Sequence, residues 1–222
     1  MIETGIRFGN IHSFYDLNLI LSEVSISPAS PKAVYTDVPG MDGSLDQTES
    51  HGEVKYYDRT GCKFTFTMNP EFDLSEAAFE AKKTEVSNLL NGIMFDKITL
   101  DKDPDYYYSG RCAVNEYLSN KRVRQIVVVA RLKPYKLKHD ETIRTFALSS
   151  TTQTVKIHSA RKPVTPIIEC TEANCKIAFG NSEVVLNAGQ HKVLDIRFTM
   201  GDNVLQLSGT GSVTFRFQEG DL

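Results

Sequence analysis

The sequence predicts a mainly β protein of two domains with one α-helix, and three observations support this prediction. Segments with the alternating or continuous apolar pattern of strands dominate the first half of the chain. One segment, residues 74–90, has helical spacing instead. Beyond residue 140, short strand candidates recur about every ten residues with turn-forming residues between them, which is typical of an antiparallel sandwich.

The strand candidates of the first half are of two kinds. Residues 63–68 alternate, which places Phe64, Phe66 and Met68 on one face of a half-buried strand. Residues 126–130 form a continuous apolar run, which is typical of a strand covered on both faces. The other strand candidates of this half are residues 24–27 and 93–100.

The helix is predicted to run from about residue 74 to residue 90. Asp73 and Glu76 have the spacing of a capping box at its start. At its end, Gly92 after Asn91 supplies a left-handed stop. Its apolar side is expected to cover a sheet. The residues at helical spacing are Phe79, Lys82, Val86, Leu89 and Leu90.

The composition shifts around residues 132–140, where Pro134 ends the preceding strand because it cannot donate to a ladder. We therefore expect one domain over residues 1–136 and a second over residues 137–222. The strand candidates of the second domain are residues 143–148, 154–158, 166–170, 176–179, 182–186, 192–198, 203–208 and 213–218.

The composition excludes several classes of protein. The hydrophobic content of 41% and charged content of 24% are those of a soluble globular protein. The net charge of −3 gives no reason to expect nucleic-acid or membrane binding. No signal peptide is predicted, and no apolar run approaches the roughly 20 residues of a membrane span. These features indicate a cytoplasmic origin.

The four cysteines (Cys62, Cys112, Cys170 and Cys175) form no C-x-x-C pair. We expect them to be reduced and buried as small apolar side chains, because thiols in the cytoplasm stay reduced. The alternative is a disulfide between Cys170 and Cys175, which a plausible turn separates.

No pattern predicts a catalytic, cofactor or metal site. Residues 101–112 imitate a calcium loop, but its sixth position is Tyr106 and its twelfth is Cys112. No serine or cysteine lies in an activating context, so the chain is not expected to be an enzyme. Tyr106, Tyr107 and Tyr108 suit either a ligand platform or, with stronger support, a core or interface. The histidines are scattered; they are His12, His51, His139, His158 and His191.

The most informative segment is VPGMDGSLD, residues 38–46. Pro39 fixes its own φ, and Gly40 or Gly43 can take a positive φ, so the backbone turns sharply. Asp42 and Asp46 can cap freed backbone donors. Such a rigid, polar loop without catalytic groups suits a contact between proteins. The alternative is a well-capped turn packed inside one subunit.

A contact between subunits would combine an apolar anchor, Met41 or Leu45, with charged groups around it. Pro39 would lower the entropy lost on docking. The residues predicted at this subunit interface are Pro39, Gly40, Met41, Asp42, Gly43, Leu45, Asp46 and Arg59.

This segment, followed by Tyr57-Asp58-Arg59 and Phe64-Thr65-Phe66, resembles the N-terminal half of the distal tail (Dit) proteins of siphophages and prophages of Gram-positive bacteria. These phages have long non-contractile tails. The resemblance covers most of the chain. Its other elements are residues 6–13, 28–32, 134–136, 201–205 and 209–215.

The resemblance implies a structural component of the virion tail tip, made in the host cytoplasm. Such proteins form a hexameric ring that joins the tail tube protein to the tail-associated spike and to receptor-binding or baseplate proteins. It also implies an N-terminal β-sandwich or split-barrel ring domain, and a galectin-like antiparallel β-sandwich at the C-terminus.

The alternative function is a carbohydrate-binding module acting in host recognition. The second domain is of the right type, but the chain has no tryptophan for a sugar platform. Its local candidates, Phe198, Phe215 and Phe217, alternate along strands and fit a core better.

Overall fold

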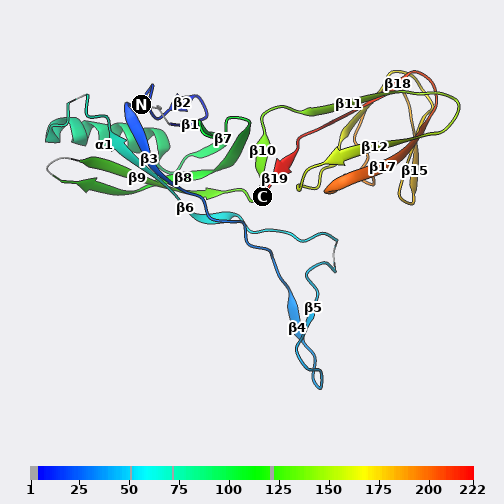
Figure 1. Ribbon diagram of the computed structural model, residues 1–222, viewed down its shortest axis with the longest axis horizontal. Coiled ribbons are helices and arrows are strands. Elements are labelled where there is room, and N and C mark those ends of the chain that lie inside the picture. The colour runs from blue at the N-terminus through cyan, green and yellow to red at the C-terminus, as the bar shows by residue number, and fades with distance from the viewer. Residues whose placement is uncertain (1–4, 51, 72, 121–122) are drawn as a thin grey trace. The chain divides into compact units, whose positions relative to one another are not determined.

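A computed structural model of the chain describes residues 5–50, 52–71, 73–120 and 123–222. The chain divides into two compact units, residues 1–136 and residues 137–222 (Figure 1). Both are built mainly of antiparallel strands, so the predicted mainly β class is confirmed. His51 lies outside the described residues. No helix in the described part of the chain is long and apolar enough to cross a membrane.

Unit 1 contains an antiparallel sheet in the order β2-β1-β7-β8-β9-β6-β3. The strands at residues 63–68, 93–100 and 126–130 are confirmed, within slightly different bounds. The register places Phe64 opposite Val128 and Phe66 opposite Ile126. The strands are β1 (Ile6–Phe8), β2 (Ile11–His12), β3 (Leu19–Ser25), β6 (Arg59–Met68), β7 (Met94–Leu100), β8 (Tyr106–Ser119) and β9 (Arg124–Leu132).

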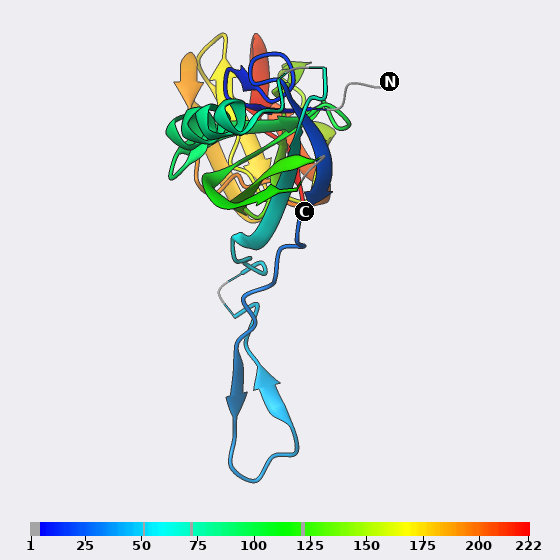
Figure 2. The same cartoon turned by 90° about the vertical axis from the view of Figure 1, so that its left-hand side faces the viewer.

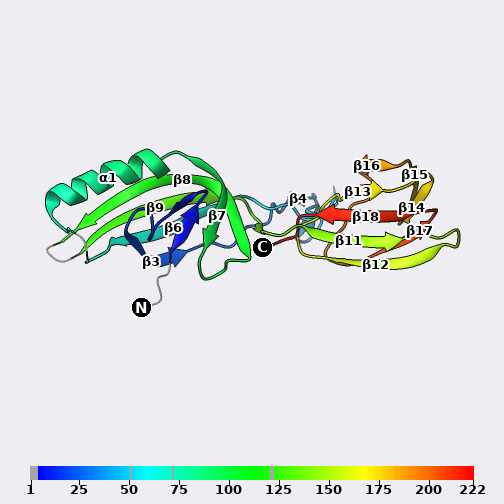
Figure 3. The ribbon, with the colours of Figure 1, turned by 90° about the horizontal axis from the view of Figure 1, so that it is seen from above.

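The single helix of the described residues, α1 (Glu76–Leu90), covers one face of this sheet (Figure 3). Its buried side chains are Phe79, Val86 and Leu90, and they join the core of unit 1. The prediction that this side covers a sheet is therefore confirmed. Leu89, which was grouped with them, is 36% exposed.

The start of the helix differs from the predicted capping box. Ser75, not Asp73, is the N-cap, and its Oγ accepts a hydrogen bond from the N–H of Ala78 at 3.2 Å. Asp73 lies two residues before the N-cap, and its carboxylate accepts a hydrogen bond from the N–H of Ser75 at 2.8 Å. Asp73 and Ser75 are both residue types that cap helices, so the sequence allows either of them. The structure uses Ser75, which directly precedes Glu76, the first residue of the helix. The predicted stop is confirmed, because Gly92 has φ = 76°.

Unit 2 is a sandwich of two four-stranded sheets, in the orders β11-β18-β13-β16 and β12-β17-β14-β15. Its core includes Phe198, Phe215 and Phe217, so the prediction that these rings fit a core is confirmed. The strands are β11 (Thr142–Ala147), β12 (Gln153–Ser159), β13 (Ile167–Cys170), β14 (Cys175–Phe179), β15 (Ser182–Leu186), β16 (Gly189–His191), β17 (Gly201–Ser208) and β18 (Ser212–Phe217).

The predicted strand at residues 192–198 is wrong. The strand of this region, β16, ends at His191, and residues 192–197 belong to no strand, with a turn at residues 194–195. Phe198 makes an isolated bridge to Val164 and is fully buried. The apolar residues at alternate positions therefore serve to anchor a loop into the core rather than to form a ladder.

Two further short strands are β10 (Lys136–Lys138) and β19 (Gly220–Asp221).

All four cysteines are free and buried, as predicted, and the alternative of a Cys170–Cys175 disulfide is wrong. Burial raises the pKa of the Cys112 thiol to about 12. Burial, together with the neighbouring Cys170 thiol, also raises the pKa of Cys175 to about 12. These thiols are therefore unreactive in the folded protein near neutral pH.

Candidate functional site

The most unusual part of unit 1 is an extended arm, residues 26–58, which connects β3 to β6. Its outer part is a hairpin of β4 (Tyr35–Asp37) and β5 (Ser44–Asp46), which pair only with each other. Figure 2 shows the hairpin leading away from the sheet of its own unit. Every residue from 31 to 47 is exposed, so this part of the arm contains no core of its own.

The root of the arm is fixed to unit 1 by Arg59. This residue is 6% exposed, and its guanidinium donates to the carbonyl oxygens of Pro134 and Ser27, both at 2.9 Å. Arg59 was grouped with the loop residues from the sequence, but the structure places it apart from them, at the base of the arm. Its hydrogen bonds suit it to holding the arm rather than to meeting a partner.

The two legs of the arm are also tied to each other near the root. The N–H of Lys32 donates to the carbonyl of Lys55 at 2.7 Å, and the N–H of Tyr57 donates to the carbonyl of Ser30 at 2.9 Å. The arm therefore leaves the unit as a paired double strand.

The tip of the arm, residues 38–46, has the turn geometry that its sequence predicts. Gly40 and Gly43 have φ values of 84° and 78°, which L side chains rarely adopt. The N–H of Met41 donates to the carbonyl of Val38 at 3.1 Å and closes the turn. Asp46 caps as predicted, accepting from the N–H of Thr48 at 2.9 Å. Hydrogen bonds from the Thr48 side chain and N–H hold the pKa of Asp46 below its ordinary value.

The hairpin of β4 and β5, with the tip, presents apolar side chains to solvent. Tyr35, Val38, Met41 and Leu45 are 64%, 40%, 47% and 44% exposed. These side chains are therefore not packed inside their own unit. An isolated two-stranded hairpin is marginally stable at best in water, so exposed apolar groups on such a hairpin favour a contact with a partner over a turn that serves only its own subunit.

Unit 1 also contains a buried histidine paired with a carboxylate at the surface, which sequence reasoning missed. His12 is 2% exposed, and its Nε2 lies 3.2 Å from both carboxylate oxygens of Asp101. Its Nδ1 accepts from the N–H groups of Phe14 and Tyr15, at 3.1 and 3.2 Å, so Nε2 carries the proton. Asp101 also accepts from the N–H of Gly5 at 2.6 Å.

Both nitrogens of the His12 ring are thus occupied by partners of the same chain, and no side-chain nucleophile contacts them among these hydrogen bonds. The arrangement ties β2 to the end of β7 and does not resemble an acid–base site. Residues 12 and 101 lie far apart in the sequence, so no local pattern could have indicated their pairing.

The three neighbouring tyrosines are covered by cations of the same unit. Lys136 Nζ lies 4.1 Å from the Tyr106 ring centroid, Lys97 Nζ lies 5.2 Å from that of Tyr107, and Arg59 lies 5.7 Å from that of Tyr108. These contacts favour a structural role over a ligand platform. In the described ranges, no group of three or more His, Cys, Asp or Glu side chains could hold a metal ion.

Comparison with solved structures finds a protein of similar fold. Over 99% of both chains, this chain is similar in structure to the SPP1 Dit (gp 19.1) protein, with a TM-score of 0.71 and 16% sequence identity. The crystal structure of that protein is described as a paradigm of the hub adsorption apparatus in phages that infect Gram-positive bacteria. No family model matches the chain, and no curated protein matches it.

At 16% identity the similarity establishes the fold. Both units are included, because the match leaves almost nothing of either chain outside it. The resemblance to the distal tail proteins inferred from the sequence is therefore confirmed at the level of the fold.

Proposed function

We propose that this chain is the structural subunit of a phage tail-tip hub, in which six copies form a closed ring. In this proposal the ring joins the tail tube to the tail spike and to receptor-binding or baseplate proteins. The observation that carries it is the structural similarity to a Dit hub protein over the full length of both units. The exposed arm provides independent support, because it has the properties of a contact between copies.

The physical role of the arm in this ring is to reach a neighbouring subunit. Head-to-tail contacts form a closed ring only when each contact fixes the rotation between neighbours, so the contacting element must be stiff. Pro39 and the hydrogen-bonded turn at Met41 provide that stiffness. Burying the side chain of Leu45 or Met41 stabilises each contact by roughly 1.5–3 kcal/mol.

We propose no catalytic reaction for the ring. The His12–Asp101 pair is occupied by structural hydrogen bonds, and a protein of similar fold is a hub protein. We infer that the protein is not an enzyme and acts in the virion tail tip by binding its neighbours.

The alternative, a carbohydrate-binding module, depends on unit 2. Its aromatic rings Phe198, Phe215 and Phe217 are buried and cannot stack on a sugar. This burial favours the hub. A glycan array probed with the full chain distinguishes the two functions, since binding that persists in a monomeric variant would favour the module.

The ring is tested by light scattering and negative-stain imaging of Leu45→Asp. A carboxylate placed in an apolar contact loses the anchor and adds a desolvation cost, so each contact should weaken at least tenfold. We expect rings from the wild-type chain and monomers from this variant at the same concentration.

The matched control is Val204→Asp. Val204 is 47% exposed, close to the 44% of Leu45, but it lies on β17 of unit 2. This variant should still form rings. A wild-type chain that stays monomeric at high concentration would contradict the hub, and intact rings of Leu45→Asp would remove the tip from the interface.

A further inference from the structure

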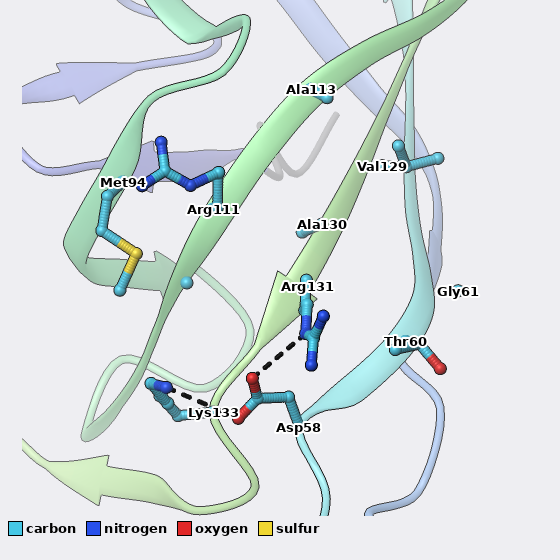
Figure 4. A pocket seen from close by; sticks show the side chains of 11 residues that line it. Asp58, Thr60, Gly61, Met94, Arg111, Ala113, Val129, Ala130, Arg131 and Lys133 are labelled. Atoms are coloured by element: carbon cyan, nitrogen blue, oxygen red, sulfur yellow. Dashed lines mark hydrogen bonds and ion pairs between the residues drawn. The ribbon is translucent and has the colours of Figure 1, made fainter.

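A hollow of about 540 Å³ lies on unit 1 at the base of the arm, where β6, β7, β8 and β9 meet (Figure 4). Arg111 and Arg131 neighbour the buried core residues Cys112 and Ala130, and side chains alternate between the two faces of a strand. Both arginines therefore lie on the face opposite the core and α1. The hollow is thus on the uncovered face of the sheet.

The hollow has an excess of positive charge. Arg111 and Arg131 are directly opposite each other in the β8–β9 register, and like charges in this position repel. Asp58 offsets part of this charge, lying 3.1 Å from Arg131 Nε and 3.5 Å from Lys133 Nζ (Figure 4). Three cations and one carboxylate leave a formal excess of two positive charges, which favours an acidic partner.

Part of the lining of the hollow is apolar. These lining residues are Met94, which is 42% exposed, and Ala113 and Val129. Gly61 and Gly110 also line the hollow. The complementary ligand therefore combines carboxylates with an apolar side chain.

The arm has this combination. Residues 33–50 contain four carboxylates and no lysine or arginine; the acids are Asp37, Asp42, Asp46 and Glu49. At the tip, the exposed side chains of Met41 and Leu45 lie next to Asp42 and Asp46 in the sequence. The arm and the hollow are complementary in both charge and polarity.

We propose that the hollow receives the arm tip of a second copy of this chain. The chain's own tip is not the occupant, because its arm leads away from the sheet, and Asp58 and Thr60, at its root, form one wall of the hollow (Figures 2 and 4). The tip of each copy then meets the arm root of the next, which is a head-to-tail contact. The inference rests on the proposed ring and names the surface that receives the arm.

The test exchanges the charges of the two surfaces in the full-length chain. One variant carries Arg131→Glu and Lys133→Glu, and the other carries Asp42→Lys and Asp46→Lys. Each alone should weaken assembly at least tenfold by light scattering, and a chain carrying all four changes should recover most of it. Assembly of the wild type should also weaken as salt is added, because exposed charges are screened.

A control with the same change of charge, Lys156→Glu with Lys192→Glu in unit 2, should leave assembly unaltered. Circular dichroism melting of each variant shows that it folds.

If the wild type assembles and the hollow variant assembles equally well, the proposal that the hollow receives the tip is overturned, while the proposed ring stands. If the wild type stays monomeric, the ring itself fails. Hollow-dependent binding of a short DNA duplex, with assembly unaffected, would overturn the proposal in favour of a nucleic-acid surface.

Discussion

Replacing Gly110 by valine should lower the free energy of unfolding of unit 1 by about 3 kcal/mol or more. A Cβ atom at this position would lie 2.3 Å from the carbonyl oxygen of Arg131 and 2.8 Å from the Cα of Leu132. Both are backbone atoms of β9, so no side-chain rotation relieves the clash. The β8–β9 ladder would have to open at the end where Gly110 pairs with Leu132, which urea unfolding followed by circular dichroism measures.

The matched control for this change is Glu116→Val. Glu116 lies on the same strand, is exposed and pairs with Val127. Valine is favoured in strands, so this variant should unfold within about 0.5 kcal/mol of the wild type. A Gly110→Val protein as stable as the control would show that β8 and β9 do not approach as closely as described.

Replacing Phe198 by alanine should destabilise unit 2 by about 3–5 kcal/mol. The ring is fully buried, and its centroid lies 5.2 Å from that of Phe217, 5.9 Å from that of Phe215 and 6.0 Å from that of Phe179. Removing it leaves a cavity between the two sheets and breaks three edge-to-face or tilted ring contacts. Thermal unfolding of the full-length chain measures the loss.

Leu194→Ala is the control, because Leu194 belongs to the same loop but is 76% exposed. It should unfold like the wild type. Equal stability of both variants would mean that residues 192–198 are not anchored into the sandwich by Phe198.

These two sites also show what the sequence could and could not predict about the fold. The strands β6 and β9 were predictable because alternating Phe64 and Phe66 and the run at 126–130 report their burial directly. The longest of the strands described, β8, with 14 residues, was not predicted. Its burial changes along its length, from partly buried through buried to exposed, so no single pattern spans it.

The segment at 192–198 illustrates the opposite error. Its alternation resembles a strand, yet the alternating residues serve to insert Phe198 into the core from a loop. Local periodicity reports which side chains are buried, and it does not distinguish a paired strand from an anchored loop.

The candidate site was predictable only in part. Turn-forming residues indicated the sharp bend at Gly40 and Gly43, and both take the expected positive φ. The hollow, in contrast, is lined by residues of four strands, of which β6 is separated from the others in sequence by the helix, and Arg111 and Arg131 become neighbours only through the β8–β9 register. The burial of Arg59 at the base of the arm could not be predicted, because proximity in sequence to the loop does not reveal burial.

The most direct test of the account is a disulfide between two different chains. One chain carries Leu45→Cys in the tip, and the other, of different length through a tag, carries Ala113→Cys in the hollow. The native cysteines are buried, and burial raises the pKa of their thiols, so they do not compete. The account predicts that co-assembly followed by mild oxidation gives the mixed dimer on a non-reducing gel. A mixed dimer no more abundant than with Val185→Cys in place of Ala113→Cys would contradict it.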